Sequence, residues 1–158
     1  MNFLDKLVPR SHVGFVVEDV DAAVKNLQQT FECALDAEPY IFKPDKAWIN
    51  GYPAGDIELK IAFCKISENV SFEYIQPVTQ DGYHFMSLVE RGDNLNHVCF
   101  VTDDLDYYRE EFKKMGAPIL FEAEVADPVR GRRRCLYTKL KGIPGVFEIQ
   151  ETAKPYCK

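Results

Sequence analysis

The chain contains an internal repeat, and this repeat constrains its fold more than any other feature of the sequence. The segment that begins at His12, HVGFVVEDVD, and the segment that begins at His97, HVCFVTDDLD, share His, Val, Phe, Val, Asp and Asp at matching positions. Each copy is typical of a strand followed by a helix start, because alternating apolar residues favour strands and Asp is favoured before a helix. The sequence therefore predicts two related structural units.

Segments of helical and of strand character follow each copy. Apolar stripes with helical spacing occupy Val20, Val24, Leu27 and Phe31 in the first half and Leu105, Tyr108, Phe112 and Met115 in the second. The alternating sequence DIELKIAFCKI and the paired endings VSFEYIQ and GVFEIQ predict further strands. Residues 38–48 and 118–125 leave room for one more strand in each half, so each half is interpreted as βαβββ.

We predict one α+β domain over residues 1–158, in which two tandem βαβββ modules form a cup-shaped mixed sheet. The modules comprise residues 8–77 and 94–152. The linker of residues 78–93 carries a short helical segment at 83–90. One module alone would bury too little apolar surface to be stable, so we expect a single cooperative unit.

The strand alternation places four ionisable side chains on one face of this sheet. Alternate residues of a strand point to opposite faces, and the apolar ones face the helices. His12, Glu73, His97 and Glu148 therefore share the other face. Two imidazoles and two carboxylates suit Zn, Co, Ni, Mn or Fe(II) and leave positions open for substrate or water. The alternative is that these residues are structural remnants of a duplication, but two of only three histidines at equivalent positions favour the metal site.

Composition and charge argue against several classes of protein. The 25 acidic and 19 basic residues give a formal net charge of −6, which repels phosphate backbones and argues against a nucleic-acid partner. No apolar run approaches the roughly 18 residues of a membrane span, so we expect a cytoplasmic protein without a membrane partner. The five cysteines include no CxxC pair, which argues against a disulfide framework or a zinc ribbon.

The paired motifs HV(G/C)FV(V/T)(E/D)D and FE(Y/I) resemble the vicinal oxygen chelate superfamily over nearly the whole chain. This superfamily includes glyoxalase I, methylmalonyl-CoA epimerase, extradiol dioxygenases and fosfomycin-resistance proteins. The resemblance implies a glyoxalase-like fold and a divalent metal held by His12, Glu73, His97 and Glu148. It also implies that the metal acts as a Lewis acid toward two oxygens of the substrate.

The choice within this superfamily depends on two opposing features. The His/Glu/His/Glu set is similar to that of bacterial-type glyoxalase I, and its fourth ligand, Glu73, argues against extradiol dioxygenase chemistry. The segment HFMSLVERGDNLNHVCFVTDDLD is instead similar to the epimerases, and LQQTFECA at residues 27–34 replaces the glyoxalase FY...LG signature. We give the longer segment more weight.

We therefore expect a metal-dependent, methylmalonyl-CoA epimerase-like isomerase that removes a proton α to a carbonyl, with Glu148 or Glu73 as the catalytic base. The alternatives are a glyoxalase I-like lactoylglutathione lyase and a metal-free binding protein of the bleomycin-resistance type. The resemblance implies a small-molecule substrate, such as an acyl-CoA or another anionic thioester, and we expect a homodimer.

Two further features of the sequence each allow two interpretations. The basic stretch from Arg130 to Arg134 is interpreted as a loop before a strand, which either meets CoA phosphates or a carboxylate or is simply solvated. His84 lies in the linker and is interpreted as structural or exposed.

Overall fold

A computed structural model describes residues 2–129 and 131–155. Within these residues the chain forms three helices, namely Val20–Phe31 (α1), Gly82–Arg91 (α2) and Leu105–Lys114 (α3). The ten described strands are Leu7–Val16 (β1), Tyr40–Phe42 (β2), Lys46–Ile49 (β3), Tyr52–Pro53 (β4), Leu59–Lys65 (β5), Val70–Pro77 (β6), Asn94–Thr102 (β7), Ile119–Asp127 (β8), Gly131–Thr138 (β9) and Phe147–Glu151 (β10). They form one sheet, in the order β2-β5-β6-β1-β7-β10-β9-β8-β3-β4.

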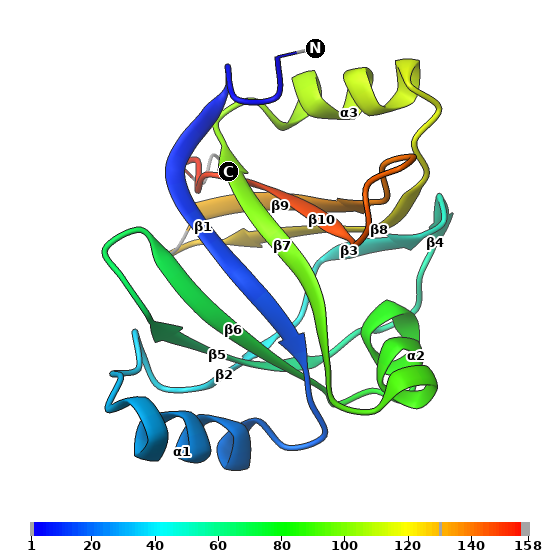
Figure 1. Ribbon diagram of the computed structural model, residues 1–158. Helices are drawn as coiled ribbons and strands as arrows, with labels where there is room; N and C mark the ends of the chain where they lie inside the picture. The colour runs from blue at the N-terminus through cyan, green and yellow to red at the C-terminus, as the bar shows by residue number, and fades with distance from the viewer. Residues whose placement is uncertain (1, 130, 156–158) are drawn as a thin grey trace.

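The sheet curls around a concave face, and β1 and β7 run side by side at its centre (Figure 1). These two strands are antiparallel, whereas β1 pairs in parallel with β6 and β7 in parallel with β10. The first and last strands of each half are therefore the four central strands of the sheet. The succession β1-α1-β2-β5-β6 and β7-α3-β8-β9-β10 confirms the predicted α+β class and its βαβββ repeat.

The hairpin of β3 and β4 departs from a simple repeat. The sequence predicts one strand in residues 38–48, but the structure has β2 and β3 in this region and β4 just after it. Strand β3 pairs with β8 of the second half, with Lys46 opposite Glu124 and Ile49 opposite Phe121. The hairpin thus extends the sheet of the other half. Side-chain alternation indicates a strand but does not identify its partner strand.

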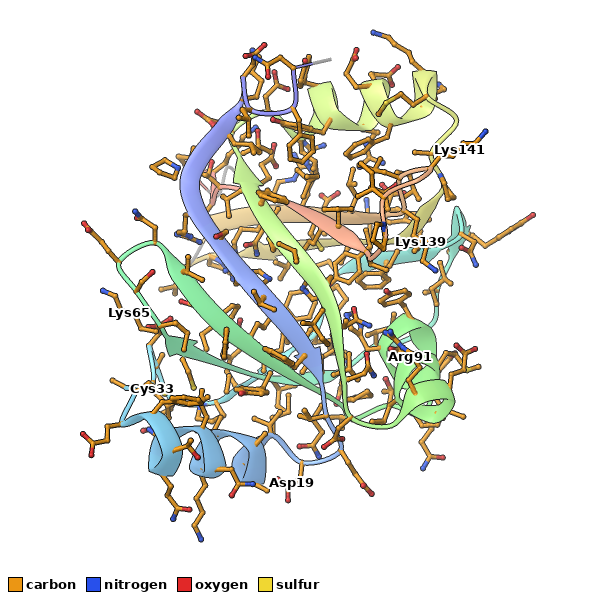
Figure 2. All side chains as sticks on the ribbon, in the orientation of Figure 1. Asp19, Cys33, Lys65, Arg91, Lys139 and Lys141 are labelled. Carbon is orange, nitrogen blue, oxygen red and sulfur yellow. The ribbon has the colours of Figure 1, made fainter. Side chains whose placement is uncertain are left out.

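Helix α1 covers the outer face of the first half of the sheet (Figure 1). Asp19 caps its start, because the carboxylate accepts a hydrogen bond of 3.0 Å from the backbone N–H of Ala22 (Figure 2). The helix packs on Tyr74 of β6. Its buried residues are Val20, Val24 and Leu27. Burial of each such side chain contributes about 1.5–3 kcal/mol to stability.

Helix α3 repeats this arrangement in the second half. Asp104 caps it by accepting a hydrogen bond of 3.1 Å from the N–H of Tyr107. Its buried residues are Leu105, Tyr108 and Phe112. They pack on Leu136 of β9 and Ile149 of β10. Since the helices cover the convex face of the sheet, the alternate side chains of the central strands are left to fill the concave side.

Helix α2 lies in the linker between the halves and includes the predicted helical segment at residues 83–90. Asp81 precedes it, and its carboxylate accepts a hydrogen bond of 2.7 Å from the N–H of Gly82. None of the helices in the described part of the chain has both the length and the apolar character that crossing a membrane requires.

Residues 131–134 of the basic stretch are not a loop, because β9 begins at Gly131. Arg132 lies 3.0 Å from Glu124 on β8, and Arg134 lies 2.8 Å from Glu151 on β10. These cross-strand ion pairs hold the basic stretch in the sheet, and they could not be seen in the local sequence. The first arginine of the stretch lies outside the described residues.

A fragment of residues 1–77 is expected to be unfolded in isolation. It would lose β7, the antiparallel neighbour of β1, and β8, the neighbour of β3. Circular dichroism and a urea titration of the purified fragment test this. Mixing it with a fragment of residues 78–158 should restore ordered structure. A cooperative transition in the isolated fragment would show that the first half is a domain by itself.

Candidate metal centre

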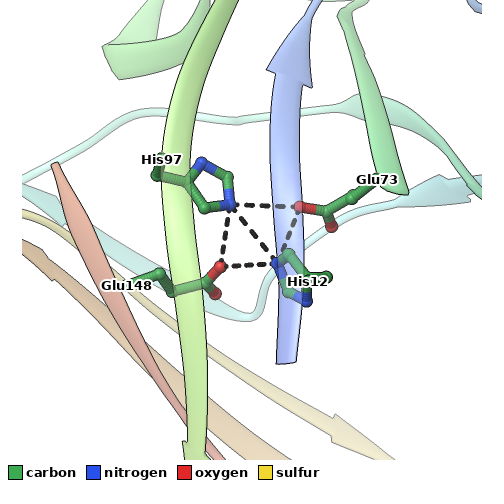
Figure 3. A group of neighbouring side chains, drawn as sticks. All are labelled: His12, Glu73, His97 and Glu148. Atoms are coloured by element: carbon green, nitrogen blue, oxygen red, sulfur yellow. Dashed lines mark hydrogen bonds and ion pairs between the residues drawn. The ribbon is translucent and has the colours of Figure 1, made fainter. Parts of the chain in front are cut away.

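Four side chains from the four central strands point toward one another on the concave face (Figure 3). They are His12 on β1, Glu73 on β6, His97 on β7 and Glu148 on β10. One nitrogen or oxygen atom of each lies within 4.8 Å of those of all the others. The structure therefore brings together all four residues that the repeat singles out. Their role as metal ligands remains a prediction.

The spacing of these atoms fits a divalent ion. His12 Nε2 lies 3.0 Å from Glu148 Oε2 and 3.1 Å from Glu73 Oε2. His97 Nε2 lies 3.0 Å from Glu148 Oε2, 3.3 Å from Glu73 Oε2 and 3.3 Å from His12 Nε2. Ligands about 2.0–2.2 Å from one ion are separated by about 3.0 Å at right angles and by about 3.4 Å in a tetrahedron. The five separations that involve a histidine are thus those that one ion could satisfy.

The polar atoms of the cluster that lack hydrogen-bond partners also support the binding of a divalent ion. Glu73 Oε2 is buried and has no hydrogen-bond partner among the described residues, although both imidazoles approach it. The Nε2 atoms of His12 and His97 face each other, and without an ion only one of two such atoms can donate to the other. A cation between them would accept a lone pair from every member of the cluster. The donor set therefore suits a metal better than a purely hydrogen-bonded network.

The orientation of the His97 ring is set by neighbouring polar residues. Its Nδ1 lies 3.0 Å from Asn96 Oδ1, and a carbonyl oxygen can only accept, so Nδ1 carries the proton. Asn96 Nδ2 in turn donates to Ser87 Oγ on α2 at 2.9 Å. This tautomer leaves the lone pair of Nε2 free to face the cluster. Asn96 could not be identified from the sequence, because no spacing rule marks the residue before a site histidine.

Gly14 leaves the space that His97 occupies. A Cβ atom at Gly14 would lie 2.1 Å from Cε1 and 2.3 Å from Nε2 of the His97 ring. No side chain larger than hydrogen fits there without displacing the imidazole. Glycine at position 14 is therefore a structural requirement of the site. Strand alternation alone shows only that Gly14 lies on the same face as His12.

The mutual contacts of the cluster shift its pKa values in opposite directions. Burial disfavours charge on His12 and His97, but the contacts of His12 with Cys99 and Glu73, and those of His97 with Glu148 and Glu73, raise the pKa of both. Burial would raise the pKa of Glu73, yet its contacts with His12 lower it to about 2. Despite burial, hydrogen bonds to both histidines also lower the pKa of Glu148. Both carboxylates are thus ionised at neutral pH.

The cluster lines a cavity of about 590 Å³ on the concave face. Phe63 and Phe121 line its apolar walls. His84 also lines it, with Nε2 3.2 Å from the hydroxyl of Tyr137, and it is buried rather than exposed. Burial lowers the pKa of His84 to about 3, so its ring is neutral. The site therefore combines ionised carboxylates with aromatic side chains and a neutral imidazole on the same cavity wall.

Replacing Gly14 by Ala is expected to lower the affinity for a divalent metal by at least about tenfold, because the new methyl group displaces the His97 ring. Isothermal titration with Zn²⁺ measures this. The matched control is Gly55→Ala, where the nearest heavy atom, Asp81 Oδ2, would be 3.9 Å from the added Cβ. Metal affinity unchanged in Gly14→Ala would contradict the packing argument.

The metal-free protein is expected to lose stability, relative to the metal-loaded protein, as the pH rises above 6.5 and through the raised folded-state pKa values of His12 and His97. The folded-state pKa values of His12 and His97 are raised, so their contribution is complete below the unfolded value of 6.5 and declines as the pH rises through the folded values. Metal binding requires neutral imidazoles and should strengthen over the same interval. Urea unfolding with a chelator and with Zn²⁺ compares the two forms. Equal pH slopes would count against this linkage.

Comparison with known proteins places this site in a family. The family model of the Glyoxalase/Bleomycin resistance protein/Dioxygenase superfamily matches residues 11–137. Among solved structures, the chain is similar to methylmalonyl-CoA epimerase from Mycobacterium tuberculosis, with 17% identity, a TM-score of 0.67, and 96% of this chain and 93% of that chain covered. It is also similar to a variant of Streptomyces coelicolor methylmalonyl-CoA epimerase in complex with 2-nitronate-propionyl-CoA, with 18% identity, a TM-score of 0.62, and 94% and 99% covered. Comparison with curated protein sequences finds no significant match.

These findings confirm the predicted family and fold. The sequence identities to the solved structures are low, so the structural similarity establishes a shared fold and leaves the substrate open. The family match covers most of the chain and includes His12, Glu73 and His97. The chain belongs to the Glyoxalase/Bleomycin resistance protein/Dioxygenase superfamily.

Proposed function

We propose that this protein is a divalent-metal-dependent isomerase that removes a proton α to a carbonyl and returns it, as an acyl-CoA epimerase does. The observation that carries this proposal is the buried cluster of two histidines and two glutamates on the wall of a cavity of about 590 Å³. A cavity of this size suits a small organic ligand.

Each residue of the cluster has a defined role in this proposal. His12, Glu73, His97 and Glu148 would hold the ion, which when bound supplies a Lewis acid for the developing negative charge on a substrate oxygen. Glu148 is the first candidate for the base, because it lines the cavity and is ionised. Glu73 meets the same conditions and is the second candidate. Inversion then requires a proton to be delivered to the opposite face of the same carbon, and the other carboxylate of the cluster is the candidate for this second step.

The proposed substrate class is an acyl-CoA or another anionic thioester. The methylmalonyl-CoA epimerases that share the fold include one in complex with methylmalonyl-CoA and NH4+, and another in complex with 2-nitronate-propionyl-CoA. The resemblance of the linker sequence to epimerases supports the same substrate class. A homodimer and a cytoplasmic location belong to this proposal as well.

A glyoxalase I-like lyase is the second candidate, and the position of Glu73 favours it. Glu73 lies within the cluster, so the chain has the full His/Glu/His/Glu set. The chemistry would again be proton transfer next to a carbonyl, on a hemithioacetal instead of a thioester. The two candidates therefore differ in substrate rather than in the roles of the four residues.

Replacing Glu148 by Gln should retain most of the bound metal and remove most proton exchange. An amide oxygen can still coordinate, whereas an amide cannot accept the proton. Replacing His97 by Ala should remove metal and exchange together, because it opens a coordination position and leaves two buried carboxylates unbalanced. Metal content is measured by elemental analysis, and exchange is measured as deuterium incorporation from solvent into methylmalonyl-CoA.

Glu90→Gln serves as the control, because Glu90 is exposed on α2 and does not line the cavity. Full exchange in Glu148→Gln would transfer the role of base to Glu73 or to another residue. Turnover of methylglyoxal with glutathione, without exchange into the acyl-CoA, would establish the lyase instead. Protein that neither retains nor rebinds metal would favour a metal-free binding protein of the bleomycin-resistance type.

A further inference from the structure

Strand β9 leads from the metal centre toward the outer part of the cavity. Tyr137, Cys135 and Arg133 are alternate residues of this strand, and all three line the cavity. The ring of Tyr137 lies 4.7 Å from that of His97, between ring centres. Arg133 is four residues away, or about 13 Å along the strand. A ligand of moderate length could therefore contact the metal centre at one end and Arg133 at the other.

Arg133 differs from its two neighbours in having no partner for its charge. Its Nε is buried and donates no hydrogen bond to any described residue. It also forms no ion pair in the described part of the chain, whereas Arg132 pairs with Glu124 and Arg134 pairs with Glu151. A buried charged donor without an acceptor is costly for the folded protein. An oxyanion supplied from the cavity would remove this cost.

The neighbouring Arg134 shows the geometry that such a ligand would use. Its Nε donates to Glu151 Oε2 at 2.9 Å, and its Nη2 donates to Glu151 Oε1 at 2.8 Å. This side-on fork matches the two oxygens of a carboxylate or of a phosphate. Arg133 carries the same Nε and Nη donors, and its Nε has no hydrogen-bond acceptor among the described residues.

The acidic side chains of the cavity wall form no ion pair with Arg133 in the described part of the chain. The carboxylates of Asp36, Glu38 and Glu68 line the cavity and belong to the part of the sheet around β2, β5 and β6. Strands β1, β7 and β10 lie between that part and β9 in the order of the sheet. Lys65, at the end of β5, also lines the cavity and adds positive charge on the acidic side (Figure 2).

We propose that Arg133 binds an oxyanion of the substrate, a carboxylate or a phosphate, through Nε and one Nη, while the reacting end of the substrate lies at the metal centre. This inference rests on the proposed function, which it narrows to substrates that carry an anionic group remote from the reacting carbon. Arg133 then determines specificity and takes no part in proton transfer.

The test compares two acids that differ only at the remote end. Isothermal titration of Co²⁺-loaded protein with 2-oxoglutarate and with 2-oxopentanoate measures how much the distal carboxylate adds to the binding affinity. A third titration uses CoA. In the wild-type protein we expect the contact with Arg133 to increase the affinity for 2-oxoglutarate or for CoA by about tenfold or more. Arg133→Gln should abolish that contribution and leave the affinity for 2-oxopentanoate unchanged. Arg133→Lys should restore only part of it, because a lysine lacks the fork.

The matched control is Arg132→Gln, which removes an adjacent charge that is already paired with Glu124. Loss of the 2-oxoglutarate preference alone identifies a carboxylate, and loss of CoA affinity alone identifies a phosphate. If Arg133→Gln and Arg132→Gln behave alike with all three probes, or if no probe binds, the inference is wrong. Metal content is measured on the same samples, so that loss of the metal centre, which would overturn the proposed function, is distinguished from loss of the Arg133 site.

Discussion

Charge balance in the buried cluster is the constraint on which the rest of the structure depends. Glu73 and Glu148 are only 7% and 4% exposed, and two negative charges at such a depth are costly unless they are compensated. Protonation of His12 and His97 brings the net charge to zero, which agrees with the raised pKa of both rings. A divalent ion between neutral imidazoles gives the same balance, whereas a monovalent ion leaves one negative charge uncompensated. The cluster therefore favours a divalent ion by its charge as well as by its spacing.

Helices α1 and α3 pack on the face of the sheet opposite to the cluster, and this packing orients the side chains of the cluster. Each central strand presents apolar side chains to a helix, as Tyr74 does to α1 and Ile149 does to α3. The same alternation turns Glu73 and Glu148, the neighbours of these residues in sequence, toward the concave face. The hydrophobic packing that stabilises the sheet thus also fixes the direction of the four side chains of the cluster. A shift of one residue in register would bury these side chains against the helices.

The features that sequence could predict are those that local periodicity determines. The repeat and the strand alternation identified His12 and His97 as residues of one face, and the structure places them 3.3 Å apart. The pairing of β3 with β8 and the burial of His84 were not predictable, because both depend on contacts between segments distant in the chain. The difference between Arg133 and its neighbours has the same origin, since only the folded sheet shows which arginines already have acidic partners.

The repeat places equivalent residues in the cluster, but their surroundings differ between the two halves. Gly14 and Cys99 are equivalent positions of the repeat, and the absence of a side chain at Gly14 lets His97 pack fully inside the sheet, with 0% exposure. His12 lies on the opposite side of the cluster and lines the cavity, as Glu73 and Glu148 also do. His12 and the two carboxylates therefore face the cavity, while His97 does not line it. The difference between Gly14 and Cys99 thus goes with different surroundings for the two equivalent histidines.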